Sequence, residues 1–262
     1  NPEIAPGYTE TRFPNPNITW ETSEMFNIGI DASFFNGKLN LEADWFYKKT
    51  NDILRERTDM PAILGYKLPA ANVGKVDNRG IDLNITHRNH LRDFNYSVAG
   101  NLTWARNKVI DLLEPAGEKN NPRQRSTGHS MSQYFGYEAL GLFQSDEEAN
   151  NWPQPQFGKA KAGDIKYKDQ NGDGIIDAED KIAIGRSNYP ELVYGLNLNA
   201  EWKGFYAGIF FQGAGNTSTV LGTGADATFF PFQWGIEESA VRSVVADRWT
   251  EQNPSQNVSP YA

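Results

Sequence analysis

The sequence predicts an all-β fold, an antiparallel transmembrane β-barrel segment with long loops on one side. Three observations predict it. Apolar and polar residues alternate over long stretches, tight-turn signals join those stretches in pairs, and the apolar positions are aliphatic in the middle and aromatic at the ends. Alternation with a period of two over about nine residues is typical of strands and not of helices.

The first pair of predicted strands turns at Asn36-Gly37. Both central residues of a type I′ turn need positive φ, and Asn-Gly meets that need. The apolar positions of the two arms are Phe26, Ile28, Ile30, Ala32 and Phe34, then Leu39, Leu41, Ala43, Trp45 and Tyr47. The pattern predicts a hairpin with one apolar face.

Two more hairpins are predicted further along the chain. One turns near His90 and the other at Lys203-Gly204. Around the first, the alternating positions are Ile81, Leu83, Ile85 and His87, then Phe94, Tyr96, Val98, Gly100, Leu102 and Trp104. Around the second they are Tyr194, Leu196, Leu198, Ala200 and Trp202, then Phe205, Ala207, Ile209 and Phe211.

The order of residues along the apolar positions favours a membrane. Aromatic residues stand at both ends of the strands and aliphatic ones between them, as amphipathic rings settle at the headgroup level of a bilayer. Along these six predicted strands the apolar positions carry no Lys, Arg, Asp or Glu, and His87 is their only residue that can become charged near neutral pH. A soluble β-sandwich with aromatic residues filling its ends is the alternative.

The connections differ in length. Three turns are short, whereas residues 51–78 and 107–132 form long connections, an asymmetry typical of outer-membrane barrels with long extracellular loops. Residues 134–167 are interpreted as a further pair of strands joined by the Pro-rich "NWPQPQFGKAKAG", which gives eight or so strands in all. Whether this pair crosses the membrane or projects outward stays open.

Composition narrows the function. The 262 residues carry a net charge of −8, which argues against a nucleic-acid partner, and contain no cysteine for disulfides or thiolate metal sites. No apolar run is long enough for a membrane-spanning helix. Both ends of the chain read as loop, which favours a piece of a larger protein.

The stretch "KDQNGDGIIDAED" has the ligand spacing of an EF-hand calcium loop. Counting Asp169 as position 1, side-chain oxygens fall at positions 1, 3, 5, 9 and 12 and glycine at position 6. The predicted calcium ligands are Asp169, Asn171, Asp173, Asp177 and Asp180, with the backbone carbonyl of Ile175. Asp instead of bidentate Glu at position 12 predicts weak binding. The alternative is a solvated turn with Asx-type capping and no ion.

Catalysis is not expected. Glu138 and Glu147 are conceivable carboxylates for glycoside hydrolysis, but no spacing marks them as a pair. His87, His90 and His129 do not form a metal motif, and neither a nucleophile elbow nor a phosphate-binding glycine loop is present. Three aromatic residues in the connecting segments have the shape to stack on sugars, although packing within the loop is the favoured use of each: Tyr134, Tyr137 and Trp152.

Several stretches together resemble one family. They are "NPNITWETSEMFNIGIDASFFNGKLNLEADWFYKKTNDIL", "NVGKVDNRGIDLNI", "YFGYEALGLFQSDEEA", "GDIKYKDQNGDGIIDAEDKIAIG", "YPELVYGLNLNAEWKGFYAGIFFQGAGN" and "VADRWTEQNPSQN". In this order they are similar to the SusC/RagA-like TonB-dependent transporters of Bacteroidetes outer membranes. The resemblance covers nearly all of residues 1–262.

The resemblance implies a partial barrel domain, part of a barrel of about 22 strands around a plugged lumen, with the plug, TonB box and final strands outside this chain. It implies TonB-dependent import of glycan- or peptide-derived nutrients across the bacterial outer membrane, with contacts to outer-membrane lipid and a SusD-like surface lipoprotein. It places residues 163–185, with the calcium motif, in an extracellular loop. A soluble, secreted, calcium-stabilised β-sandwich that binds carbohydrate is the alternative function.

Overall fold

The computed structural model describes residues 14–56, 69–114, 121, 123–220 and 246–256. The chain forms two compact units. One unit comprises residues 1–132 and 189–217, and is called the sheet unit; the other comprises residues 133–188 and 218–262, and is called the loop unit.

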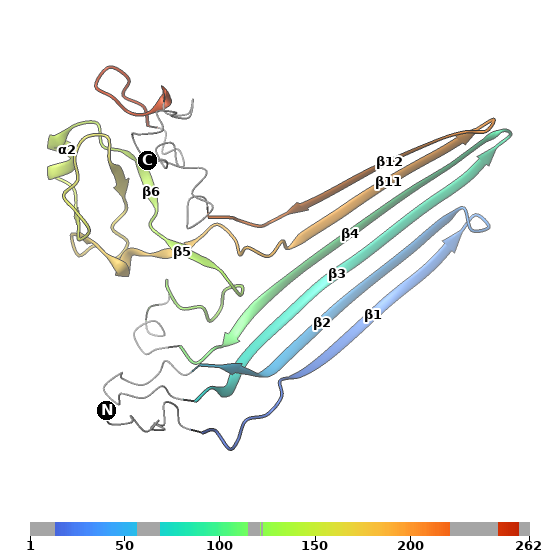
Figure 1. Cartoon of the computed structure of the whole chain (residues 1–262), viewed down its shortest axis with the longest axis horizontal. Helices are drawn as coiled ribbons and strands as arrows, with labels where there is room; N and C mark the ends of the chain where they lie inside the picture. The colour runs from blue at the N-terminus through green and yellow to red at the C-terminus, as the bar shows by residue number, and fades with distance from the viewer. Residues whose placement is uncertain (1–13, 57–68, 115–120, 122, 221–245, 257–262) are drawn as a thin grey trace, which may run out of the picture. The chain divides into compact units, whose positions relative to one another are not determined.

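The sheet unit contains one antiparallel sheet of six strands in the order β1-β2-β3-β4-β11-β12. Figure 1 shows β1 to β4 side by side as long strands, with the β11–β12 hairpin continuing the sheet. The strands are β1 (Thr22–Phe34), β2 (Leu39–Arg55), β3 (Ala71–Leu91), β4 (Phe94–Asp111), β11 (Leu192–Trp202) and β12 (Phe205–Gly215). Among the described residues the sheet is open, with β1 and β12 at its edges.

The register confirms the apolar face expected from alternation. Residues paired across neighbouring strands share a face, so a row can be followed across the whole sheet. One such row is Ile30, Ala43, Leu83, Leu102, Tyr194 and Gly213. A row nearer the turns is Phe34, Leu39, His87, Val98, Leu198 and Ile209. We call this side of the sheet the apolar face and the opposite side the polar face.

Two of the expected turns are confirmed and one is displaced. Asn36 and Gly37 have φ of 56° and 84°, and Lys203 and Gly204 have 48° and 85°, as type I′ turns require. The turn expected near His90 lies at residues 92–93 instead, because β3 continues to Leu91 and pairs it with Phe94. His90 stays in the strand, where its ring contacts the side chain of Asn95 on β4.

The long connections are shorter than the sequence analysis expected. β2 continues to Arg55, β3 begins at Ala71 and β4 ends at Asp111, so parts of the intervals 51–78 and 107–132 are strand. The extensions carry charged residues, which obscured the alternation in the sequence. The strands therefore reach beyond their own aromatic ends.

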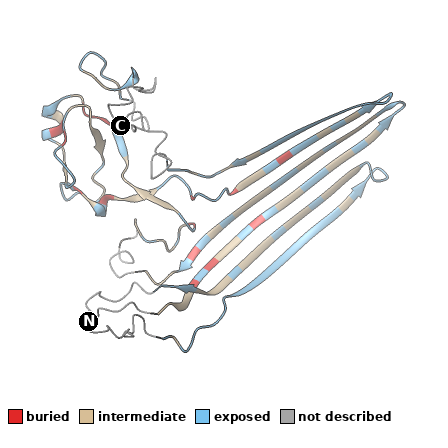
Figure 2. Cartoon of the chain, in the orientation of Figure 1, coloured by how far each residue is buried: buried red, intermediate tan, exposed pale blue. Residues whose placement is uncertain are grey.

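The apolar face of the sheet is not packed into a dry core among the described residues, so the alternative of a soluble sandwich is wrong. Ile28, Ile30 and Ile209 are 60%, 66% and 54% exposed. The other sheets of the described residues have two strands each and are too small to cover a six-stranded face. In Figure 2 exposed and intermediate residues dominate all six long strands, and buried ones are sparse.

The loop unit is built from short elements. Its strands pair as β5 with β10, β6 with β8, and β7 with β9, the last pair being parallel. The elements are β5 (Tyr134–Gly136), β6 (Ala139–Leu142), α2 (Asp146–Asn150), β7 (Gln154–Pro155), β8 (Ile165–Tyr167), β9 (Ile175–Ile176), η2 (Ala178–Asp180) and β10 (Ile182–Ile184). Phe143, Ala149 and Ala160 form a small buried cluster against which Trp152 packs.

The further pair of strands expected in residues 134–167 is present as β6 and β8, which pair on either side of the Pro-rich link, but both strands are short. A strand that crosses a bilayer needs about 9–11 residues, and the longest strand in this interval, β6, has four. Pro153 and Pro155 lack a backbone N–H and cannot donate to a continuous ladder. The described residues also contain no helix that is long and apolar enough to cross a membrane.

Candidate functional sites on the sheet and in the acidic loop

The polar face of the sheet carries carboxylates and amides that hydrogen-bond to one another. Asn84 donates its side-chain amide to Glu42 at 3.0 Å, and the Thr103 hydroxyl donates to Asp82 at 2.7 Å. A hollow of about 490 Å³ on this face is lined by Glu42, Asp44, Asp82, Asn84, Asn101, Thr103, Asn197 and Phe210, among others. Such a surface offers acceptors and donors to a hydrated polar solute.

Two exposed aromatic residues on the polar face were not predicted from the sequence. Tyr206 and Phe210 pair with Glu201 and Asn197, so they lie on the side opposite Phe205 and Phe211, and they are 88% and 62% exposed. The available signal was the break in alternation, since aromatic residues stand next to one another at 205–206 and 210–211. A flat ring beside carboxylates and amides is suited to stacking on a sugar or a peptide bond.

The first half of the acidic loop is a series of turns closed by side chains. The Asp169 carboxylate accepts the N–H groups of Gly172 at 2.6 Å and Gly174 at 2.9 Å. Asn171 accepts from Asp173 at 3.0 Å, and Asp173 accepts from Ile175 at 2.9 Å. The N–H of Gly174, followed by that of Gly172, holds the pKa of Asp169 below its usual value. These are the Asx-type turns of the ion-free alternative.

The second half of the loop is tied back by a buried carboxylate. Asp180 is 0% exposed and accepts the N–H groups of Gln170 at 2.7 Å and Asp177 at 2.9 Å. Asp177 in turn accepts from Glu179 at 2.8 Å, which completes a capping box around η2. Asp180 therefore joins the start of the loop to its end.

The loop's chemistry fits calcium, but the ion remains a prediction. Its side chains are hard oxygen donors on alternate residues, and Gly174 has φ of 85°, the sharp turn expected at position 6. Within the described residues, no group of three or more His, Asp or Glu side chains is placed to hold a metal. The backbone N–H bonds occupy one lone pair of each engaged carboxylate oxygen and leave others to accept.

The remaining candidates have structural partners. Glu138 accepts from Gln170 at 2.7 Å and from Lys168 at 3.1 Å, and these contacts, the Gln170 amide first, hold the pKa of its carboxyl below the usual value. A general acid would need the opposite shift. Glu147 lies in the first turn of α2, and its backbone carbonyl accepts from Asn151. No contact of these residues marks a catalytic site.

The three histidines and the loop aromatics are also placed. His87 stacks against Tyr96 at a centroid distance of 5.5 Å, and the backbone carbonyl of His129 accepts from Val109. Tyr134 lies in β5, and Tyr137 packs with Phe157 and Tyr167. Burial raises the pKa of both tyrosines of this cluster.

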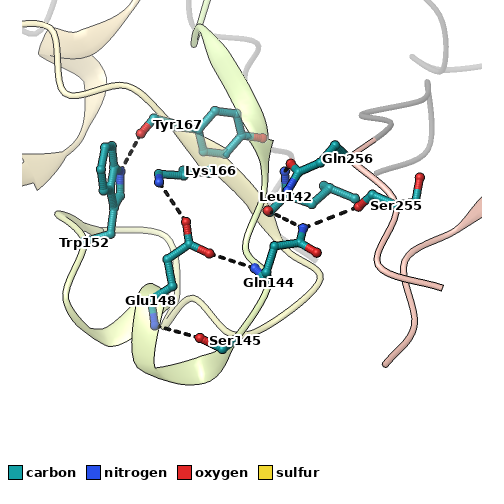
Figure 3. Close-up of polar contacts among 9 residues, drawn as sticks. All are labelled: Leu142, Gln144, Ser145, Glu148, Trp152, Lys166, Tyr167, Ser255 and Gln256. Carbon is teal, nitrogen blue, oxygen red and sulfur yellow. Dashed lines mark hydrogen bonds and ion pairs between the residues drawn. The ribbon is translucent and has the colours of Figure 1, made fainter. Parts of the chain in front are cut away.

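Figure 3 shows the polar contacts that hold α2 and its surroundings. Ser145 caps the helix by accepting from Glu148, whose carboxylate accepts from Gln144 and pairs with Lys166 at 2.8 Å. The Trp152 indole donates to the Tyr167 carbonyl, and Lys166 lies 4.0 Å from the centroid of the Trp152 ring. Packing within the loop unit accounts for Trp152.

The same network joins two distant stretches of sequence. Gln256 accepts from the N–H of Leu142 at 3.1 Å, and Gln144 donates to the carbonyl of Ser255 at 3.4 Å. The Trp249 indole donates to Gln144 at 3.2 Å. Two of the stretches quoted for the resemblance, residues 134–149 and 245–257, therefore meet in the loop unit.

An open sheet of long antiparallel strands, with one apolar face and one polar face, defines a segment of a membrane β-barrel. The family model described as "TonB dependent receptor-like, beta-barrel" matches residues 2–227, and the chain belongs to this family.

Relatives agree with this assignment. TonB-dependent receptor P26 of Formosa agariphila is 32% identical over 96% of this chain and 26% of the receptor. TonB-dependent receptor SusC of Bacteroides thetaiotaomicron is 25% identical over 73% of this chain and 19% of its own length. The solved structure of the RagAB peptide transporter shares the fold with a TM-score of 0.72 at 23% identity, over 97% of this chain and 27% of that chain. The chain spans about a quarter of the length of P26 and of the matched RagAB chain, and about a fifth of the length of SusC.

Proposed function

We propose that this chain forms part of the barrel of a TonB-dependent transporter that imports nutrients across the bacterial outer membrane, and that it has no catalytic role. The continuous apolar rows across six strands carry the proposal, because such a face is stable against lipid and not against water. Family membership supports the same function. The long strand extensions and the loop unit would lie on the extracellular side.

The polar face supports a hydrated path for glycan- or peptide-derived nutrients. Phe210 lines a hollow together with carboxylates and amides, a combination that fits the apolar faces and hydroxyls of sugars as well as peptide groups. Among the relatives, RagAB is described as a peptide transporter. Energy would come from TonB acting on a plug outside this chain, with a SusD-like lipoprotein at the extracellular mouth.

Uptake by the full-length transporter tests this function. Phe210→Ala is expected to slow uptake of the cognate oligosaccharide or peptide several-fold, since stacking on an aromatic ring contributes about 1 kcal/mol. Ile209→Ala, one residue away on the apolar face, is the matched control and should leave uptake unchanged. Transport that continues at the wild-type rate in cells lacking TonB would contradict the proposal.

We also propose that the acidic loop binds calcium through Asp169, Asn171, Asp173, Asp177, Asp180 and the Ile175 carbonyl. The donor set and the position of Gly174 support this proposal. The ion would supply a cation for the carboxylates and brace an external loop that has few buried apolar residues. The soluble carbohydrate-binding sandwich is not proposed, because the sheet has no dry core among the described residues.

A further inference from the structure

Beyond its aromatic end, the apolar face of the sheet becomes charged, with more cationic than acidic side chains. The row of Ile28, Trp45, Ile81 and Trp104 is followed by a row of Phe26, Tyr47, Arg79 and Arg106, and then by Glu24, Lys49, Asp77 and Lys108. Arg79 and Arg106 are directly paired in the register. Like charges opposite each other on one face are destabilising unless an anion lies between them.

The height of this cationic end matches the edge of a bilayer. From Leu91, in the row next to the tight turn, to Ile81 there are ten residue steps along β3. At about 3.3 Å per residue and a tilt of about 40°, these steps span a height of about 25 Å, the apolar thickness of an outer-membrane barrel. Arg79 and Arg106 lie two residues further, about 5 Å higher, at the depth of lipid headgroups.

The side chains of Arg79, Arg106 and Lys108 line a hollow in the surface of the sheet unit. Its volume is about 370 Å³, and its lining includes Tyr47, Asp77, Arg79, Arg106, Asn107, Lys108, Ile110 and residues 128–130. The backbone of this last segment is fixed, because Val109 donates to His129 and Gly128 donates to Val109, each at 2.8 Å. The hollow is therefore lined by residues of three strands, β2, β3 and β4, and by a hydrogen-bonded segment.

The charges of the hollow are not balanced by its own carboxylates. Asp77 accepts the Tyr47 hydroxyl at 2.5 Å, and Glu191 pairs with Arg106 at 3.2 Å. Across the described part of the chain, the side chains of Arg79 and Lys108 have no hydrogen-bond or ion-pair partner, although Asp77 lies opposite Lys108 in the register, and both residues are exposed. Lys49 lies 5.6 Å from the centroid of the Tyr47 ring and adds a further cation to the same face.

We propose that this hollow binds a phosphate group of an outer-leaflet lipid, with Arg79 and Lys108 as the main contacts and Arg106 beside them. The inference rests on the proposed membrane function. Guanidinium and ammonium groups are the usual protein partners of phosphate, and the adjoining row of Trp45, Ile81 and Trp104 offers an apolar surface to the acyl chains of the same molecule. A lipid phosphate fits this hollow better than a soluble acid does, because the positive charge of the hollow lies at the depth of the lipid headgroups.

Lipid binding to the purified full-length receptor tests the proposal. Bisphosphorylated lipid A and its fully dephosphorylated form are titrated into the receptor in a neutral detergent, and bound lipid is counted by native mass spectrometry. The wild type is expected to bind the phosphorylated lipid about thirtyfold more tightly, from about fivefold for each of two unpaired cations. The double variant Arg79→Gln/Lys108→Gln should lose this preference, and Arg79→Lys/Lys108→Arg should keep most of it.

A matched control removes two cations from the polar face. Lys48→Gln/Arg88→Gln leaves the hollow intact and should bind both lipids as the wild type does. Equal binding of the two lipids by the wild type, a comparison that needs no variant, would overturn the inference. So would full displacement of the lipid by millimolar inorganic phosphate, which would assign the hollow to a free anion. A receptor that imports nutrient but does not distinguish the lipids refutes this inference alone.

Discussion

The sheet unit and the loop unit are stabilised in different ways. The sheet is held by backbone ladders over strands of 11 to 21 residues, while most of its residues are exposed or half-buried. The loop unit has short strands, a small buried cluster and many side-chain-to-backbone hydrogen bonds. The sheet therefore depends on surroundings outside the described residues to cover its faces, whereas the loop unit is stabilised by its own internal contacts.

The largest expected effect comes from placing a charge on each face of one strand. Leu41→Arg puts a guanidinium on the apolar face and should lower the free energy of unfolding by roughly 2–4 kcal/mol in lipid. Asn40→Arg, its neighbour on the polar face, should be tolerated because water solvates it. Denaturant unfolding of the full-length receptor in vesicles measures both. Equal losses for the two variants would remove the distinction between the faces.

A second comparison tests close packing on the polar face. A Cβ at Gly80 would lie 2.5 Å from the Phe46 ring and from the backbone oxygen of Trp104, whereas a Cβ at Gly100 would meet only the oxygen of Gly195 at 4.0 Å. Gly80→Ala is therefore expected to destabilise the sheet by about 1–3 kcal/mol, and Gly100→Ala by much less. Thermal unfolding in detergent measures the stability of both variants. Equal melting temperatures for Gly80→Ala and Gly100→Ala would refute the close contact at Gly80.

Calcium removal should act on the loop unit and not on the sheet. For a weak site at millimolar calcium, binding stabilises the loop by about 1 kcal/mol. Chelator should speed proteolysis within residues 163–185 in the wild type, and Asp173→Ala should abolish this sensitivity. Glu147→Ala, which removes a carboxylate outside the loop, should remain sensitive. Cleavage that ignores chelator in the wild type would leave the loop as an ion-free turn.

The smallest effect is a pH dependence confined to the loop unit. The N–H of Gln144, and then Lys166, lower the pKa of Glu148 in the folded state. A depressed pKa means that its contribution is present above the unfolded value of about 4.3 and is lost as pH falls through the folded pKa. The loss of protection against hydrogen exchange in residues 143–149 should therefore show a step as the pH falls through the folded pKa of Glu148. The Glu148→Gln variant should not show this step. A step of the same size in Glu148→Gln would assign it to another group.

The sheet could be predicted from sequence because its information is local and periodic. Alternation and the turn residues Asn36-Gly37 and Lys203-Gly204 determine which residues share a face, and the register confirmed them. The prediction failed where alternation gives way to charge, as at Arg79 and Arg106, and where two aromatic residues adjoin, as at Phe210.

The loop unit could be predicted only in part. The glycine turn at Gly174 followed from spacing, but the buried position of Asp180 did not, since a carboxylate is buried only when distant N–H groups satisfy it. Likewise, no local sequence pattern predicts the hydrogen bond between Leu142 and Gln256, which are more than a hundred residues apart. Contacts of this kind depend on the fold and leave no periodic signal.

Contact between the apolar face and lipid can be measured through the fluorescence of Trp45. Trp45 lies on the apolar face in the row that ends the aliphatic band and is 41% exposed. In a full-length receptor whose other tryptophans are replaced by Phe, a lipid-attached quencher at headgroup depth is expected to dim Trp45 strongly. A quencher at the bilayer centre or in water should do so weakly. Strong quenching from water, with no dependence on depth in the bilayer, would show that the apolar face does not contact lipid.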